Sequence, residues 1–139
     1  MNAHDELAGR SVLIVEDECV IAIDLAEVLT ERGAIVVGPA FTIEAAFELL
    51  AAERSLDVAV LDMQLDSTCD YAIAEALVKR GVPTVFATGL RSADVPARFA
   101  SVPRCEKPID LEMIVHAVAE EIARHGRSWR HRQRLTATG

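Results

Sequence analysis

The stretch SVLIVEDECV, residues 11–20, joins a short apolar run directly to three acids. The apolar part, Val12–Val15, is short and rich in β-branched residues, which is typical of a buried parallel strand. Glu16, Asp17 and Glu18 follow it, and carboxylates crowded in this way must take up protons, separate or share a cation. Asp17 and Glu18 could also cap a helix that begins after the strand, because acids are favoured at a helix N-terminus.

The same pattern recurs along the chain, with amphipathic helical periods between the apolar runs. This alternation predicts an α/β fold: a doubly wound five-stranded parallel sheet with helices on both faces. The stretch RSADVPARFASVP, residues 91–103, carries Pro96 and Pro103, so the fourth helix is expected to be short, starting near Pro96, or irregular. The other predicted elements are strands at Val12–Val15, Ile35–Val37, Val58–Leu61, Val82–Ala87 and Ser101–Cys105, and helices around residues 21–29, 43–50, 73–77 and 111–122, with Gly33, Gly81 and Gly126 as helix ends.

Length and composition favour one globular domain. The chain has 139 residues, 51% of them hydrophobic, which is enough to bury a substantial core. Its longest charge-free stretch, Gly33–Ile43, has 11 residues and is too short to cross a membrane, and the N-terminus lacks the apolar run of a secretory signal. Cys19, Cys69 and Cys105 show no CxxC spacing, which argues against disulfides and zinc. We therefore expect a cytoplasmic protein whose cysteines are free and buried.

Charge is divided unevenly between the body of the chain and its last residues. All 22 acidic residues lie in residues 1–125 together with ten basic ones, which gives this part a net charge of −12. An acidic body disfavours DNA as a direct partner. Residues 126–139 contain no acid and four arginines, Arg127, Arg130, Arg132 and Arg134. This basic tail could contact phosphate or an acidic protein surface, although a solvated, frayed terminus is the simpler interpretation.

Residues capable of chemistry fall at the predicted strand ends. In a doubly wound sheet, binding sites lie where the carboxyl ends of the parallel strands meet. The first strand ends in the three acids, the third in Asp62 and the fourth in Thr88, and the fifth runs into Lys107. We therefore expect carboxylates, a hydroxyl and an ammonium group to converge at one edge of the sheet.

This set of side chains suits a phosphoryl group held beside a metal ion. Oxygen ligands favour a hard cation, above all Mg²⁺. Lys107 could pair with a phosphoryl oxygen, and Thr88 could donate a hydrogen bond to it. Asp62 could act as a nucleophile and form an aspartyl phosphate. Each residue alone has an ordinary explanation as a cap, a turn or a surface group, but their occurrence at successive strand ends argues against coincidence.

The segments LIVEDE, VAVLDMQL, VFATG and CEKP, in this order, resemble the receiver domain of two-component response regulators. The resemblance covers about residues 10–125, leaving residues 1–9 as an N-terminal extension and residues 126–139 as a basic C-terminal tail. It implies a flavodoxin-like fold, bound Mg²⁺ or Mn²⁺, and Asp62 as phosphoacceptor from a histidine kinase or a histidine phosphotransfer protein. The implied metal ligands are Glu16, Asp17, Asp62 and the main-chain carbonyl of Gln64, and the implied phosphate contacts are Thr88 and Lys107.

A narrower resemblance is to the single-domain receivers called the FAT GUY group. The stretch YAIAEALVKRGVPTVFATGL, residues 71–90, is similar to them at Phe86–Gly89, and Asp66 stands where common receivers have proline. Ordinary receivers carry a Tyr or Phe three residues before the lysine, and this ring rotates on phosphorylation; here the position is Arg104. Our hypothesis is that Gly89–Pro103 orders or shifts instead.

The resemblance implies a signalling protein, not an enzyme with a separate substrate. The 14 residues after the domain cannot hold a DNA-binding domain, so we expect a stand-alone receiver that acts through a downstream protein, a phosphate relay or a phosphate sink. Glu18 then becomes a spare acid, better explained by the helix N-terminus than by the metal. One alternative is a degenerate receiver that binds partners without phosphorylation, which Arg104 would favour. Another is a Mg²⁺-dependent aspartyl phosphatase, disfavoured because neither Asp17 nor Asp62 has an acid two residues later.

Overall fold

The computed structural model describes residues 6–53, 55–65, 68–69, 71–89 and 94–138. Five parallel strands form the main sheet in the order β2-β1-β3-β6-β7, and β4 pairs with β5 in a small antiparallel sheet. The strands are β1 (Ser11–Val15), β2 (Ile35–Ala40), β3 (Val58–Leu61), β4 (Gln64–Leu65), β5 (Thr68–Cys69), β6 (Thr84–Thr88) and β7 (Arg104–Glu106). The helices are α1 (Cys19–Glu31), α2 (Ile43–Ala52), α3 (Ala72–Lys79), the 3-10 helix η3 (Ala97–Phe99) and α4 (Leu111–Thr138).

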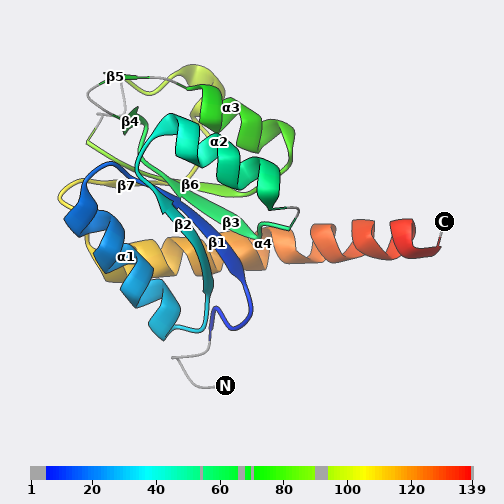
Figure 1. The fold of residues 1–139 in the computed structure, drawn as a ribbon. Coiled ribbons are helices and arrows are strands. Elements are labelled where there is room, and N and C mark those ends of the chain that lie inside the picture. Colours follow the sequence, from blue (N-terminus) through cyan, green and yellow to red (C-terminus); the bar gives the residue numbers. More distant parts are fainter. Residues whose placement is uncertain (1–5, 54, 66–67, 70, 90–93, 139) are drawn as a thin grey trace.

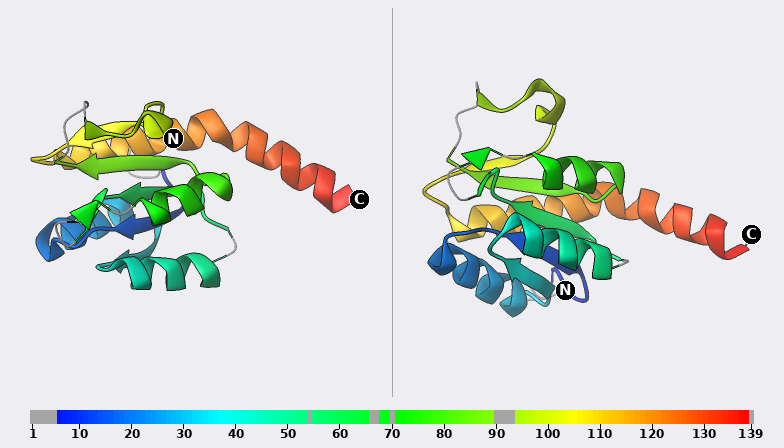
Figure 2. Two further views of the ribbon diagram at one scale, coloured as in Figure 1. Left: turned by 90° about the horizontal axis from the view of Figure 1, so that it is seen from above. Right: turned by 45° about the horizontal axis from the view of Figure 1, so that its top comes forward.

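Helices cover both faces of the main sheet, as predicted (Figures 1 and 2). One apolar core lies between the sheet and the pair α1 and α4, and it includes Leu25 of α1 and Val118 of α4. The other lies between the sheet and the pair α2 and α3, and it includes Leu50 of α2 and Leu77 of α3. The protein is therefore a three-layer α/β structure with two cores.

β1 is the strand around which the sheet is organised. Its residues alternate between the two cores, with Val12 and Ile14 on the side of α1 and α4 and Leu13 and Val15 on the other side. β1 pairs with β2 on one edge and with β3 on the other, so the strand order changes direction at β1. In open α/β sheets the crevice at such a switch point, outside the carboxyl ends of the strands, is the usual position of a binding site.

The predicted elements are present, with shifted bounds. β2 continues to Ala40, β6 begins at Thr84 instead of Val82, and the last strand is Arg104–Glu106 instead of the predicted 101–105. The short helix expected near Pro96 is η3, which begins directly after that proline. The β4–β5 hairpin was not predicted, because two-residue strands have no periodicity to detect.

α4 does not end at Gly126, which makes that prediction wrong. The helix runs from Leu111 to Thr138, and its last part extends away from the sheet (Figure 1, orange to red). A glycine inside a helix costs about 1 kcal/mol relative to alanine, which the surrounding alanine, arginine and glutamine residues can offset. The side chains from residue 126 onward lie outside the described residues, so the roles suggested for Arg127, Arg130, Arg132 and Arg134 stay predictions. In the described ranges neither α4 nor any other helix is long and apolar enough to cross a membrane.

The residues before β1 take part in the core. Leu7 is fully buried against α1 and α4, and its main-chain N–H donates to the carbonyl of Arg32 at 3.1 Å. Gly33 follows α1 with a φ of +95°, and a Cβ there would lie 2.9 Å from the Cα of Ala8. Gly33 is thus required both by its left-handed backbone and by the close approach of the N-terminal segment.

The cysteine prediction is only partly confirmed. Cys19 and Cys105 are free, but Cys19 is exposed at the start of α1, contrary to the prediction, whereas Cys105 is buried in β7. The side chain of Cys69 lies outside the described residues, as does Asp66, which carried part of the narrower resemblance. Cys19 and Val20, the first two residues of α1, face solvent, whereas Ala22 is the first residue of this helix that is buried.

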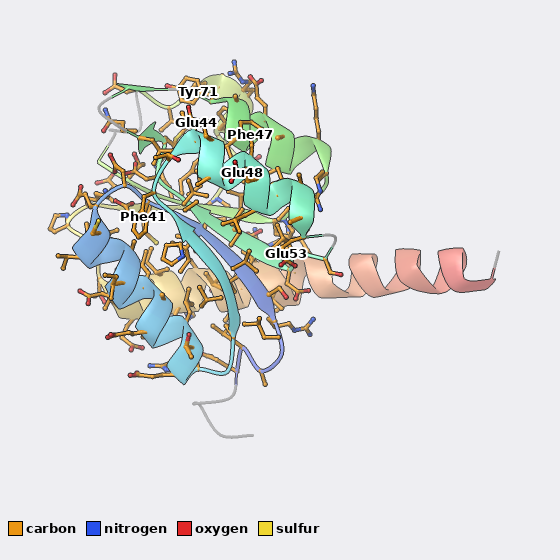
Figure 3. The ribbon with its side chains drawn as sticks, viewed as in Figure 1. Phe41, Glu44, Phe47, Glu48, Glu53 and Tyr71 are labelled. Atoms are coloured by element: carbon orange, nitrogen blue, oxygen red, sulfur yellow. The ribbon has the colours of Figure 1, made fainter. Side chains whose placement is uncertain are left out.

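Aromatic and acidic side chains share the surface around α2. Phe41, before the helix, and Phe47, within it, are 39% and 37% exposed. Glu44 and Glu48 are also exposed on this helix (Figure 3). The buried side of α2 is marked by Leu50, so this helix separates an apolar face from a mixed acidic and aromatic one.

Candidate functional site

The acids predicted at the ends of β1 and β3 lie together. One carboxylate oxygen from each of Glu16, Asp17 and Asp62 lies within 4.8 Å of the other two. Parallel pairing places them there, because the N–H of Asp62 donates to the carbonyl of Val15 and that of Glu16 to the carbonyl of Ala40, both at 3.0 Å. Glu16 and Asp62 are only 1% and 3% exposed. The structure thus gathers three carboxylates in a mostly buried position.

Lys107, directly after β7, contacts three carboxylates. Its Nζ donates to Glu16 Oε1 at 2.9 Å, to Asp62 Oδ2 at 2.9 Å and to Glu18 Oε1 at 3.0 Å. Burial alone would lower the pKa of Lys107, but these three hydrogen bonds outweigh burial and raise that pKa above its usual value. The lysine is therefore a cation throughout the physiological pH range.

Glu16 is buried with incomplete hydrogen bonding. Burial raises the pKa of Glu16 to about 7, an effect larger than the lowering by the hydrogen bond from Lys107. Its Oε1 accepts hydrogen bonds from Lys107 Nζ and from the N–H of Glu18, at 3.3 Å, whereas its Oε2 is buried and has no hydrogen-bond partner among the described residues. An unsatisfied buried oxygen is costly, so this atom points to a ligand that is positively charged or a hydrogen-bond donor.

The donor set fits a hard divalent cation. Mg²⁺ prefers oxygen ligands and usually binds one or two carboxylates while keeping several waters. Glu16, Asp17 and Asp62 provide such oxygens, including the unsatisfied Oε2 of Glu16. The main chain of Gln64 lies beside them, since its N–H donates to Asp62 Oδ1 at 2.9 Å. The residues predicted to hold the metal are therefore brought together by the fold.

A pocket of about 470 Å³ opens beside Asp17, Asp62 and Lys107, and we call it the acidic pocket. Thr88, the last residue of β6, is fully buried, and its carbonyl accepts a hydrogen bond from the N–H of Lys107 at 3.0 Å. A tetrahedral anion with bound waters fits in a space of this size. The pocket is lined by Asp17, Glu18, Asp62, Gln64, Gly89 and Lys107.

Glu18 is not one of the three clustered acids and lies at the N-terminus of α1, but its carboxylate has a partner that the prediction did not include. Glu18 is the N-cap residue of α1, but its side chain accepts no hydrogen bond from the helix N–H groups. Its carboxylate contacts Lys107, 89 residues away in sequence. No local pattern reports such a contact, because it depends on how closely the start of α1 approaches the loop after β7.

Arg104 is the residue that the sequence resemblance aligns with the aromatic switch position of ordinary receivers. It begins β7, is half-buried and pairs in register with Phe86 of β6. A different aromatic residue packs on β6. Phe99 of η3 is 2% exposed, and its ring centroid lies 5.7 Å from that of Phe86 in an edge-to-face arrangement. η3 is therefore anchored to the strand that ends at Thr88.

Comparison with known proteins supports the assignment that the site suggests. No family model matches the chain. The chain is 30% identical over 124 residues to the transcriptional regulatory protein PdtaR of Mycobacterium tuberculosis. This match covers 86% of the chain but only 60% of PdtaR, so the chain spans less than two thirds of the curated relative.

Solved structures, response regulators among them, share the fold. The BeF3-activated conformation of SdrG from Pseudomonas melonis is 34% identical, with a TM-score of 0.67 and coverage of 81% of this chain and 95% of SdrG. The N-terminal domain of a three-domain response regulator from Carboxydothermus hydrogenoformans is 25% identical, with a TM-score of 0.73 over 86% of this chain and 98% of that domain. A response regulator receiver protein from Sinorhizobium medicae, at 21% identity and a TM-score of 0.70 over 83% and 95% of the two chains, shares the fold. On sequence similarity, strand order and the acidic pocket together, the chain belongs to the receiver domains of two-component response regulators.

Proposed function

We propose that this receiver accepts a phosphoryl group on Asp62 in a Mg²⁺-dependent reaction. The observation that carries the proposal is the position of the Asp62 carboxylate, which is 3% exposed, lies beside Glu16 and Asp17, and accepts a hydrogen bond from Lys107 at 2.9 Å. A nucleophile flanked by cation ligands on one side and an ammonium group on the other has the arrangement that phosphoryl transfer requires.

In the proposed reaction a carboxylate oxygen of Asp62 attacks phosphorus. The new O–P bond forms as the P–N bond of a phosphohistidine donor breaks, and the departing imidazole nitrogen keeps the bonding electron pair and takes a proton. The N–H of Gln64 and the ammonium of Lys107 hold the two Asp62 oxygens, at 2.9 Å each, so the carboxylate is fixed before the donor arrives. Thr88 and Lys107 would then contact the transferred group.

Mg²⁺, or Mn²⁺, would offset the charge that develops on the phosphoryl oxygens. The chain would hold it with the carboxylates of Glu16, Asp17 and Asp62 and with the main-chain carbonyl of Gln64. The unsatisfied Oε2 of Glu16 supports this, because a bound cation would give that oxygen a partner.

The receiver family suggests both the source of the phosphoryl group and the way in which the signal is passed on. A histidine kinase or a histidine phosphotransfer protein would supply the phosphoryl group, and SdrG, whose solved conformation is activated by BeF3, is similar over 81% of this chain. We further propose that the chain belongs to the FAT GUY group of receivers, based on Phe86–Gly89, and signals through protein contacts, phosphate relay or a phosphate sink. PdtaR is a transcriptional regulatory protein, but its match spans 60% of its length, and the acidic body of this chain disfavours direct DNA binding.

The switch in this receiver would use the segment from Gly89 to Pro103. Arg104 cannot rotate as an aromatic ring does, whereas Phe99 links η3 to Phe86 on the strand that ends at Thr88. A shift of Thr88 toward a phosphoryl group would therefore reach η3 through this aromatic pair. Amide hydrogen exchange with and without beryllofluoride tests this, and unchanged protection in residues 94–103 would exclude it; residues 90–93 lie outside the described residues.

Incubation with a small phosphodonor and Mg²⁺, followed by intact mass measurement, tests the main proposal. We expect one added phosphoryl group on the wild type and none on Asp62→Asn. Labelling that survives in Asp62→Asn would remove Asp62 from its role. A wild type that gains no phosphoryl group from the small donor or from a histidine kinase would instead favour the degenerate receiver.

A further inference from the structure

Glu18 extends from the start of α1 across the acidic pocket to Lys107. Its Oε1 lies 3.0 Å from Lys107 Nζ, and 58% of its side chain is exposed. As the N-cap residue of α1 it accepts no hydrogen bond from the first turn of the helix, and within the described ranges its carboxylate contacts Lys107. The side chain is therefore oriented toward the site, although it is not one of the three clustered metal-binding acids.

Lys107 has no spare donor in this arrangement. A lysine ammonium has three N–H groups, and here they point to three carboxylates, those of Glu16, Asp62 and Glu18. A phosphoryl oxygen that approaches Lys107 needs one of these N–H groups. When Asp62 becomes an acyl phosphate its carboxylate charge is lost, so the N–H that contacts Asp62 can pass to the phosphoryl group. A second N–H for that group requires Glu16 or Glu18 to give up its contact.

The contact that breaks at lowest cost is the one to Glu18. Glu16 has a side-chain exposure of 1% and remains a carboxylate after the transfer, and a buried carboxylate left without its cation is strongly destabilising. Glu18 is largely exposed, so water can replace Lys107 as its partner. Its charge also lines the pocket into which the anionic group must enter.

We propose that Glu18 is a positioning residue that holds Lys107 in the unphosphorylated protein and competes with the phosphoryl group for its third N–H. The inference rests on the proposed function, because it takes Asp62 as phosphoacceptor. Removing the contact should favour the phosphorylated form, since Lys107 is then free to turn toward the new group. The expected gain is about two- to fivefold in affinity, the range given by partly exposed ion pairs.

Beryllofluoride affinity at saturating Mg²⁺ tests the competition, with half-saturation read from the amide signals of Gly89 and Lys107. Glu18→Gln removes the charge and leaves only a weaker, neutral acceptor, whereas Glu18→Asp keeps the charge on a side chain one methylene too short for a 3.0 Å contact. Glu106→Gln is the matched control, because Glu106 is exposed, adjoins Lys107 in sequence, and makes no ion pair among the described residues. We expect both Glu18 variants to bind about two to five times more tightly and Glu106→Gln to be unchanged.

The remaining outcomes separate the inference from the proposed function. If Glu18→Asp binds like the wild type, the effect of Glu18 is general charge and not the contact with Lys107, and the inference fails. If Glu18→Gln changes affinity no more than Glu106→Gln, it fails as well. Absence of binding in the wild type would instead overturn the proposed function. Ammonium proton exchange of Lys107, measured without beryllofluoride, should be faster in Glu18→Gln, and an unchanged rate would contradict the resting contact directly.

Discussion

Replacing Lys107 with glutamine tests the electrostatics of the acidic pocket. The change removes the cation that contacts Glu16, Asp62 and Glu18 and leaves a neutral polar side chain that is one atom shorter. Glu16 and Asp62, with side-chain exposures of 1% and 3%, then lie together without that counter-ion. Breaking a buried ion pair by removing one partner costs about 3–5 kcal/mol.

Two features of the site reduce this cost. Lys107 is 16% exposed, so water reaches the site through the pocket, and Glu16 can take up a proton because its pKa is about 7. We therefore expect the free energy of unfolding to fall by about 2–4 kcal/mol at pH 8 without divalent cations. The loss should be smaller at pH 6, where Glu16 is mostly protonated and carries less charge to compensate.

Urea unfolding followed by circular dichroism measures the change, first with a chelator and then with Mg²⁺. An ion present at ten times its dissociation constant stabilises the folded state by about 1.4 kcal/mol. Mg²⁺ should restore part of the loss, because the ion supplies the missing positive charge. It should also stabilise Lys107→Gln more than the wild type, since no lysine then competes for the carboxylates.

Lys79→Gln is the control for the loss of one positive charge. Lys79 is exposed on α3 and makes no ion pair in the described part of the chain, so its replacement should change stability by less than about 0.5 kcal/mol. The comparison is made at pH 8 without divalent cations. If Lys107→Gln lowers the free energy of unfolding no more than Lys79→Gln does, the stabilising interaction inferred between Lys107 and the buried carboxylates is refuted.

Three further predictions follow from the site and the core. Burial raises the pKa of Glu16 to about 7, and a metal ligand must be deprotonated. The Mg²⁺ affinity, measured by calorimetry, should therefore rise about tenfold from pH 6 to pH 8 and level off above pH 8. Equal affinities at the two pH values would contradict this. Leu7→Ala should lower the free energy of unfolding by about 2–5 kcal/mol in urea, since Leu7 is fully buried, and a loss below 1 kcal/mol would place Leu7 outside the core. Gly33→Ala should cost about 1–3 kcal/mol, because φ is +95° and the new Cβ would lie 2.9 Å from Ala8; an unchanged thermal midpoint would exclude this backbone conformation.

The strands and most helix ends were predictable because their signals are local. Val12–Val15 and Val58–Leu61 are continuous apolar runs, and both are buried strands in the structure. Gly33 marks a helix end because its left-handed backbone is a property of a single residue and its neighbours. Gly126 carried the same signal and was misleading, since a glycine only weakens a helix and does not forbid it.

The members of the site could also be named in advance. Glu16, Asp17, Asp62 and Lys107 were predicted to meet because each follows a parallel strand, and parallel strands end at the same edge. The acids lie within 4.8 Å of one another, and Lys107 contacts two of them. This convergence depends only on strand polarity and on the order of the elements along the chain.

The sequence by itself determined the α/β class, the five strands and the residues that converge at the carboxyl edge of the sheet. The tertiary structure decided how those residues share their charges. Glu18 contacts Lys107 across 89 residues, and Oε2 of Glu16 is buried without a partner among the described residues. Such features depend on ångström-scale distances and on burial, which arise only when distant segments pack. Periodicity reports which side of an element is apolar, whereas the energy of a charge depends on what lies beside it.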